Sequence, residues 1–198
     1  MEFINNFLSR FDNANEIISG NLISGKLFLG NYHSALNPKF LAENNITVIS
    51  NISVDIPFID DILEPYELHK YGINKLEKFR IPVFDSLLEH DINLMTNYLP
   101  HILQFLIKKL INEKKNILIH CHKGAQRSSC IIISLLYTLI QNDIMIFSGI
   151  YLPEKTNNNT KLMKNIIKFV QKKRPCVFSY GLRVNFRKSI NNYFHITL

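Results

Sequence analysis

Apolar residues recur at helical spacing at the start of the chain. Phe3, Ile4, Phe7, Leu8 and Phe11 predict an amphipathic helix over roughly the first dozen residues. Its apolar stripe needs a partner, because an isolated short helix is marginal in water. The stripe packs either on its own domain or on a second copy of the chain, which would make a homodimer.

The pattern then alternates between strand and helix. Residues 26–29 predict a strand, a short helix begins near Pro38, and residues 46–51 predict a β-branched strand. Residues 55–77 contain two prolines and a glycine and are interpreted as irregular, and residues 79–83 resume an extended segment. This alternation indicates an α/β fold.

The second half of the chain is richer in helices. Apolar residues share one face of a long helical pattern that Pro100 should kink or divide into two helices. Residues 117–120 predict a central buried strand, and residues 130–140, apolar nearly all round, predict a core helix. Two further amphipathic helices are expected over residues 161–173 and 185–194. The apolar face of the long pattern consists of Ile92, Met95, Leu99, Ile102, Leu106 and Leu110.

Length and composition narrow the class of protein. A chain of 198 residues with 46% hydrophobic residues is typical of one folded domain. The longest apolar run, residues 130–140, is far shorter than the roughly 20 residues of a membrane-spanning helix. No secretory signal is evident at the N-terminus, and three cysteines suit a reducing compartment. We therefore expect a cytoplasmic protein without a membrane span.

Charge is distributed unevenly along the chain. Residues 1–154 carry 13 basic and 16 acidic side chains, a net charge of −3, whereas residues 155–198 carry 10 basic and no acidic ones. This basic C-terminal quarter is either the solvated face of terminal helices or a docking surface for an anionic partner. The frequent Ile, Asn and Lys residues, all encoded by A/T-rich codons, suggest an A+T-rich genome of viral or parasitic type.

One polar loop carries the clearest chemical signal. It separates the strand 117–120 from the core helix and contains a cysteine and an arginine with five residues between them, Cys121 and Arg127. Backbone N–H groups at a helix N-terminus can bind a tetrahedral anion, and Gly124 permits the tight curvature this needs. Arg127 can close the ring with a fork that matches two phosphate oxygens. The same positive field would lower the pKa of Cys121 and make it a nucleophile.

The loop resembles the signature His-Cys-x5-Arg-Ser/Thr of the cysteine-dependent protein phosphatases, matched by His120, Cys121, Arg127 and Ser128. Further likeness over about residues 26–190 narrows the resemblance to the dual-specificity phosphatases. The size of the chain is similar to that of the small poxvirus-type members of this family. It implies a single phosphatase domain with a mixed central β-sheet flanked by helices. We accordingly divide the chain into an N-terminal helical extension, residues 1–25, and a catalytic domain, residues 26–198.

The resemblance also implies a two-step mechanism without a metal or other cofactor. Cys121 attacks phosphorus while Asp85 protonates the departing oxygen, and water then hydrolyses the phosphocysteine with Asp85 as base. Arg127 and the loop amides stabilise the equatorial oxygens. His120 is expected to orient the loop, and Ser128 to help the thiolate leave.

The identity of the acid has an alternative. Asp85 directly follows the segment Ile81-Pro82-Val83-Phe84, which looks like the family's general-acid segment. Asp91 is a competing carboxylate, but it lies where a helix N-cap is expected. We therefore assign Asp85 as the acid.

The remaining loop residues are assigned to substrate binding, and the expected substrates are phosphoproteins carrying phosphotyrosine or phosphoserine/threonine. His122 and Lys123 add two potentially cationic side chains, so an RNA 5′-phosphate or a phosphoinositide is an alternative substrate. A catalytically silent phospho-binding module is the non-enzymatic alternative. The assigned substrate-binding residues are His122, Lys123, Gly124, Ala125 and Gln126.

Overall fold

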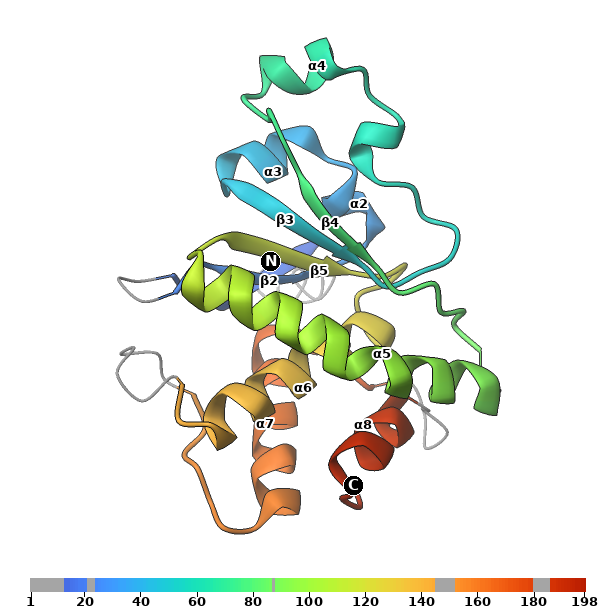
Figure 1. Ribbon diagram of the computed structural model, residues 1–198, viewed down its shortest axis with the longest axis vertical. Coiled ribbons are helices and arrows are strands. Elements are labelled where there is room, and N and C mark those ends of the chain that lie inside the picture. The colour runs from blue at the N-terminus through green and yellow to red at the C-terminus, as the bar shows by residue number, and fades with distance from the viewer. Residues whose placement is uncertain (1–12, 21–23, 87, 145–151, 180–185) are drawn as a thin grey trace, which may run out of the picture.

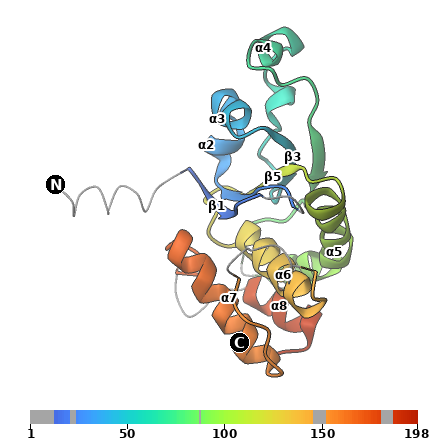
Figure 2. The same cartoon turned by 90° about the vertical axis from the view of Figure 1, so that its left-hand side faces the viewer.

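Five strands form one sheet in the order β1-β2-β5-β3-β4 (Figures 1 and 2). The computed structural model describes residues 13–20, 24–86, 88–144, 152–179 and 186–198. β1 pairs antiparallel with β2, and the other neighbours are parallel, so the sheet is mixed as expected. The strands are β1 (Ala14–Ile18), β2 (Leu27–Gly30), β3 (Ile46–Asn51), β4 (Glu77–Arg80) and β5 (Asn116–His120).

Alternate residues of the central strands pack on opposite faces of the sheet. Ile117 and Ile119 of β5 belong to one apolar core, whereas Leu118 belongs to the other, since successive side chains of a strand point to opposite sides. The smaller core lies under α2 (Tyr32–Ala35) and α3 (Pro38–Glu43). The larger core lies under α5 to α8 on the opposite face (Figures 1 and 2). The central strands are therefore buried on both sides, as the continuous apolar run of β5 predicts.

The segment 55–77 is more regular than the sequence analysis expected. It contains the 3-10 helix η1 (Ile59–Asp61) and the α-helix α4 (Pro65–Lys70). Pro65 was counted as a breaker, but it occupies the first turn of α4, where the missing N–H costs nothing. The irregular interpretation of this segment is wrong for these two helices.

Helix α5 (Glu89–Ile107) runs without a break through Pro100 and continues into the π-helical turn η2 (Lys108–Asn112). The division of this segment into two helices at Pro100 is therefore not observed. Pro100 is exposed, while the apolar face, including Met95 and Leu99, is fully buried. The remaining helices are α6 (Arg127–Gln141), α7 (Asn159–Lys173) and α8 (Phe186–Phe194).

The sheet begins earlier in the chain than the predicted domain boundary. Ala14–Ile18 forms β1 at the edge of the sheet, so this part of the segment 1–25 is a strand of the sheet and not a helical extension. Its ion pair between Glu16 and Lys26, 3.4 Å apart, joins β1 to the residue before β2. The predicted amphipathic helix lies in residues 1–12, outside the described residues, and the homodimer stays a prediction.

Candidate active site

The cysteine loop lies at the carboxyl edge of the sheet, where β2, β3, β4 and β5 all end. It begins at Cys121, directly after β5, and ends at Arg127, the first residue of α6. Parallel strands bind ligands outside their carboxyl ends, and here the N-terminus of a buried helix also points at the loop. The fold thus places the loop at a natural anion-binding position.

Cys121 lies at the bottom of the loop and is 1% exposed. Its Sγ atom accepts hydrogen bonds from the Gly124 N–H and the Ser128 Oγ–H, both 3.2 Å away. Burial by itself raises the pKa of this thiol, but the Arg127 charge and the hydrogen bonds from Ser128 and Gly124 outweigh it. The pKa of Cys121 is therefore lowered below that of an ordinary thiol. This sulfur therefore ionises more readily than an ordinary thiol, which favours it as a nucleophile.

Arg127 is held in place but keeps hydrogen-bonding capacity for a ligand. Its Nη1 donates to the Val83 carbonyl at 3.0 Å, and its Nη2 lies 3.5 Å from Asp85 Oδ2. Its Nε is buried and has no hydrogen-bond partner among the described residues. A buried donor without a partner is costly, so an anion in the loop would satisfy it.

Asp85 follows the extended segment after β4 and reaches the loop through the ion pair with Arg127. Its side chain is 49% exposed, so an incoming substrate can approach it directly. The neighbouring Phe84 is 60% exposed and stands on the same rim. The structure thus brings Asp85 to the cysteine loop, although the two segments are far apart in the sequence.

Asp91 has a different place from the one expected. It is the third residue of α5, after the N-cap Leu88, and is 3% exposed. Its Oδ1 accepts from the Phe84 N–H at 3.3 Å, and its Oδ2 accepts from the Ser86 Oγ–H. The carboxylate therefore holds the residues on both sides of Asp85, and the expectation of an N-cap is wrong.

His120, the last residue of β5, is fully buried behind the loop. Neither ring nitrogen makes a hydrogen bond of ordinary geometry within the described residues. Burial lowers the pKa of His120 to about 3, with a smaller opposing effect of the Cys121 backbone, and the charges of Arg80 and Arg127 act with burial. Its imidazole is therefore neutral, and its backbone fixes the loop through the hydrogen bond from Ile52 N–H to its carbonyl, 2.9 Å.

The back of the loop is fixed by a residue to which sequence reasoning gave no role. Arg174, at the end of α7, donates from Nε to the Gly124 carbonyl at 2.8 Å and from Nη2 to the Lys123 carbonyl at 3.0 Å. The Ala125 carbonyl accepts from the Phe178 N–H. Because these carbonyls are held outward, the N–H groups of the same peptide units point into the loop. The only signal in the sequence was the pair Arg174-Pro175, far along the chain from the loop.

Gly124 is needed for this arrangement. Its φ is +69°, and a Cβ atom there would lie 2.4 Å from the Gly30 carbonyl oxygen and 2.8 Å from Arg174 Nη2. A residue with a side chain would be strained and would push the loop away from β2. The expected role of this glycine in tight curvature agrees with the geometry.

The other loop residues assigned to substrate binding differ in exposure. His122 and Lys123 are exposed, and the His122 ring contacts Tyr32 of α2, with centroids 4.9 Å apart and the ring planes tilted by 38°. Gln126 is half-buried, and both polar atoms of its side chain lack partners among the described residues. His122 and Lys123 can therefore meet a substrate at the rim.

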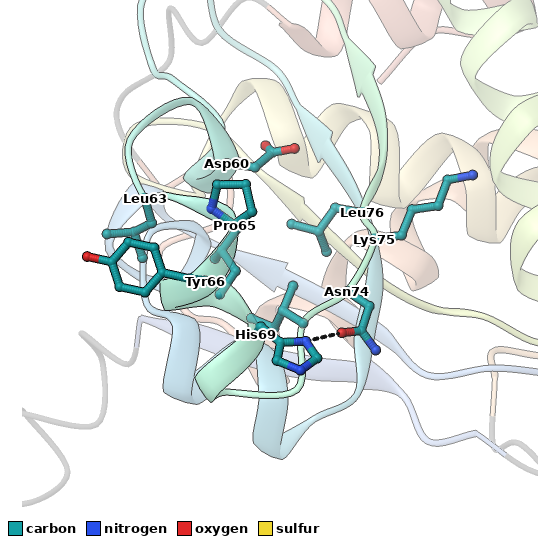
Figure 3. A pocket seen from close by; sticks show the side chains of 10 residues that line it. Asp60, Leu63, Pro65, Tyr66, His69, Asn74, Lys75 and Leu76 are labelled. Atoms are coloured by element: carbon teal, nitrogen blue, oxygen red, sulfur yellow. Dashed lines mark hydrogen bonds between the residues drawn. The ribbon is translucent and has the colours of Figure 1, made fainter.

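A separate cavity of about 600 Å³ lies beside α4, outside the cysteine loop. Figure 3 shows its lining, where His69 Nδ1 and Asn74 Oδ1 form a hydrogen bond of 2.8 Å. None of the residues assigned to catalysis or substrate binding lines it. The chemistry therefore belongs to the loop and not to this cavity.

A mixed sheet, a helix-capped cysteine loop, its arginine and a facing carboxylate together define the class of cysteine-dependent phosphatases. The family model for the dual specificity phosphatase catalytic domain matches residues 27–172, which is more than half of the chain. The chain therefore belongs to the dual-specificity phosphatase family.

Solved structures share this fold. Human DUSP28 has a TM-score of 0.58 at 16% identity, over 92% of this chain and 93% of that one. The Yvh1 phosphatase domain from Chaetomium thermophilum has a TM-score of 0.63 at 19% identity, with 91% and 95% covered. The human tyrosine phosphatase-like serine/threonine/tyrosine-interacting protein has a TM-score of 0.59 at 20% identity, with 92% and 95% covered.

Comparison with curated proteins gave no match. Among the helices of the described ranges, none is both long enough and apolar enough to cross a membrane.

Proposed function

We propose that this protein hydrolyses phosphotyrosine and phosphoserine/threonine in phosphoproteins through a phosphocysteine intermediate. The observation that carries the proposal is the environment of Cys121. Its buried sulfur accepts two hydrogen bonds inside a loop whose Arg127 lowers its pKa. A core cysteine without catalytic use needs none of these features; Cys130 is an example, since burial raises the pKa of its thiol.

In the first step the Cys121 thiolate attacks phosphorus, the S–P bond forms and the bond to the leaving oxygen breaks. Asp85 supplies the proton that the leaving oxygen takes away. The loop amides and Arg127, through its unpaired Nε, stabilise charge on the equatorial oxygens.

In the second step water attacks phosphorus and gives its proton to Asp85, and the S–P bond breaks. The Ser128 Oγ–H, 3.2 Å from the sulfur, stabilises the thiolate as it leaves. No step needs a metal ion.

The three cysteines are all free thiols, which supports a reducing compartment such as the cytoplasm. The high content of Ile, Asn and Lys supports an A+T-rich genome of viral or parasitic type, and a virion is then a second location.

A second candidate substrate carries more than one phosphate, as an RNA 5′ end or a phosphoinositide does. The exposure of His122 and Lys123 on the loop favours it, because two cations at the rim can meet a further phosphate. A silent phospho-binding module would keep the anion site without turnover.

Phosphate release by the purified protein tests the proposal. Phosphotyrosine and phosphothreonine peptides, a phosphoinositide and 5′-triphosphorylated RNA are compared, with Cys121→Ser as the inactive variant and Cys130→Ser as the matched control. We expect release from both peptides that Cys121→Ser abolishes and Cys130→Ser retains. Release from lipid or RNA alone would change the substrate class, and binding without release would favour the silent module.

A further inference from the structure

The lysines of α7 form a continuous cationic row on its exposed face. Lys161, Lys164, Lys168 and Lys172 are all exposed, and at 3.6 residues per turn they fall within an arc of about 80°. At 1.5 Å per residue the row is about 16 Å long, with neighbours about 4.5 to 6 Å apart along the axis. The basic surplus of the C-terminal quarter is thus gathered in part into one straight line.

This row is not balanced by acidic side chains. Helix α7 contains no acidic residue, and none of the four lysines has an ion-pair partner within the described ranges. Like charges three or four residues apart destabilise a helix, so a merely solvated face would be better served by mixed charges. Seven lysines elsewhere form an ion pair with a carboxylate: Lys26, Lys39, Lys78, Lys108, Lys109, Lys155 and Lys188.

A shallow hollow of about 470 Å³ accompanies the row. Asn158, Thr160 and Asn165 line it together with the lysines at 161, 164 and 168. Every one of these side chains can donate a hydrogen bond, and no carboxylate lines it. The hollow suits a ligand that offers only acceptors and negative charge.

The opposite face of α7 is not free to insert into a membrane interface. Leu162, Met163, Ile166, Ile167 and Val170 are buried, and α7 packs on α6 in the larger core (Figure 2). A helix that lies in a membrane interface must offer its apolar face to lipid, and this face is already covered.

Protein partners are also disfavoured. Stable protein interfaces use exposed apolar or aromatic anchors, whereas α7 contributes none of the large exposed apolar residues that the structure describes. Those residues are Val54, Ile62, Tyr66, Tyr71, Phe84 and Leu88.

We propose that the α7 lysine row binds a nucleic-acid strand through its phosphodiester backbone. Such a strand presents one negative charge per nucleotide and phosphate oxygens that accept hydrogen bonds, and lysine contacts to it carry no sequence preference. None of the four lysines belongs to the catalytic loop, which α7 reaches through Arg174 at its end, so binding does not require phosphatase turnover.

Fluorescence anisotropy with a labelled, mixed-sequence single-stranded RNA tests the row. The variant Lys164→Gln/Lys168→Gln/Lys172→Gln removes three charges from it. The control variant Lys39→Gln/Lys108→Gln/Lys188→Gln removes three exposed charges elsewhere. Affinity is measured between about 50 and 200 mM salt, because each phosphate contact contributes about 0.7 to the logarithmic salt slope for single strands.

We expect the α7 variant to weaken RNA binding and to lower the salt slope by about 2, while the control variant binds like the wild type. Both variants should hydrolyse a small aryl phosphate at the wild-type rate, which separates this proposal from the proposed function. Equal slopes for the α7 variant and the wild type would overturn the proposal. So would an equal loss in the control, or binding only to phosphatidylserine vesicles or polyglutamate.

Discussion

The carboxylate of Asp91 offers a sharp test of how the general acid is positioned. It accepts hydrogen bonds from the Phe84 N–H and the Ser86 Oγ–H, one on each side of Asp85. The variant Asp91→Ala removes both without touching Asp85 itself. The segment is then released, and Asp85 lies beside Arg127 for only a small fraction of the time.

The magnitude follows from the two lost bonds. A hydrogen bond to a charged group contributes about 1.5 to 3 kcal/mol, so at the lower value the two together hold the segment by about 3 kcal/mol. Each 1.4 kcal/mol is about a factor of ten, so the population with Asp85 in place falls by up to about 100-fold. This lies within the roughly 10²- to 10⁴-fold that general acid catalysis typically contributes.

The assay compares two substrates. A phosphothreonine peptide has a leaving oxygen that must be protonated in the first step, so kcat/KM for Asp91→Ala should fall by up to about 100-fold. 4-Nitrophenyl phosphate has a leaving group that departs without a proton, so its kcat/KM, which reports the first step and not the hydrolysis that Asp85 assists, should change little. Asp85→Asn should give the same contrast between the two substrates, and its loss on the peptide should be at least as large as that of Asp91→Ala. An equal loss on both substrates, or no loss on either, would refute this reasoning.

Other variants probe the loop itself. Arg127→Met removes the charge that lowers the pKa of Cys121, so alkylation of Cys121 by iodoacetamide should need a higher pH than in the wild type; an unchanged pH profile would contradict this. Gly124→Ala should lower the free energy of unfolding by about 1 kcal/mol or more and abolish phosphate release, because of its φ of +69° and the contact with Gly30; chemical denaturation and activity assays check both. A lysine at position 174 lacks the guanidinium fork that donates to two carbonyls at once, so Arg174→Lys should lower kcat by about tenfold. Circular dichroism should show that the fold is intact. Iodoacetamide at neutral pH should label Cys121 and leave Cys130 unlabelled, since burial raises the pKa of Cys130; mass spectrometry of the peptides shows which is modified.

Local patterns predicted the elements that are strongly apolar. The runs that became β3, β5 and α6 carry enough β-branched and apolar residues to define both their type and their burial. In β1 the sequence Ala-Asn-Glu-Ile-Ile is short, two of its five residues are polar, and only its pairing with β2 makes it a strand. Edge strands of this kind depend on tertiary context more than on their own residues.

The residues of the active site also differ in how far the sequence predicted their roles. The loop residues are contiguous, so one motif predicted Cys121 and Arg127, and the segment 81–84 pointed to Asp85. The supporting contacts of Asp91 and Arg174 join segments that are distant in the sequence or run against a local expectation. A carboxylate near the start of a helix suggests a cap, and only the hydrogen bonds to Phe84 and Ser86 show that it holds the acid segment instead.

Trapping the covalent intermediate tests the central claim most directly. The Asp85→Asn variant is mixed briefly with 4-nitrophenyl phosphate, whose leaving group needs no proton, so the phosphocysteine forms while its hydrolysis, which needs Asp85 as base, is slow. The sample is quenched and digested, and the fragment containing Cys121 is measured by mass spectrometry. Phosphate should be found on Cys121, and the signal should be absent from Cys121→Ser treated in the same way. Phosphate release by the wild type without any phosphorylated Cys121, or with phosphate on another residue, would contradict the account.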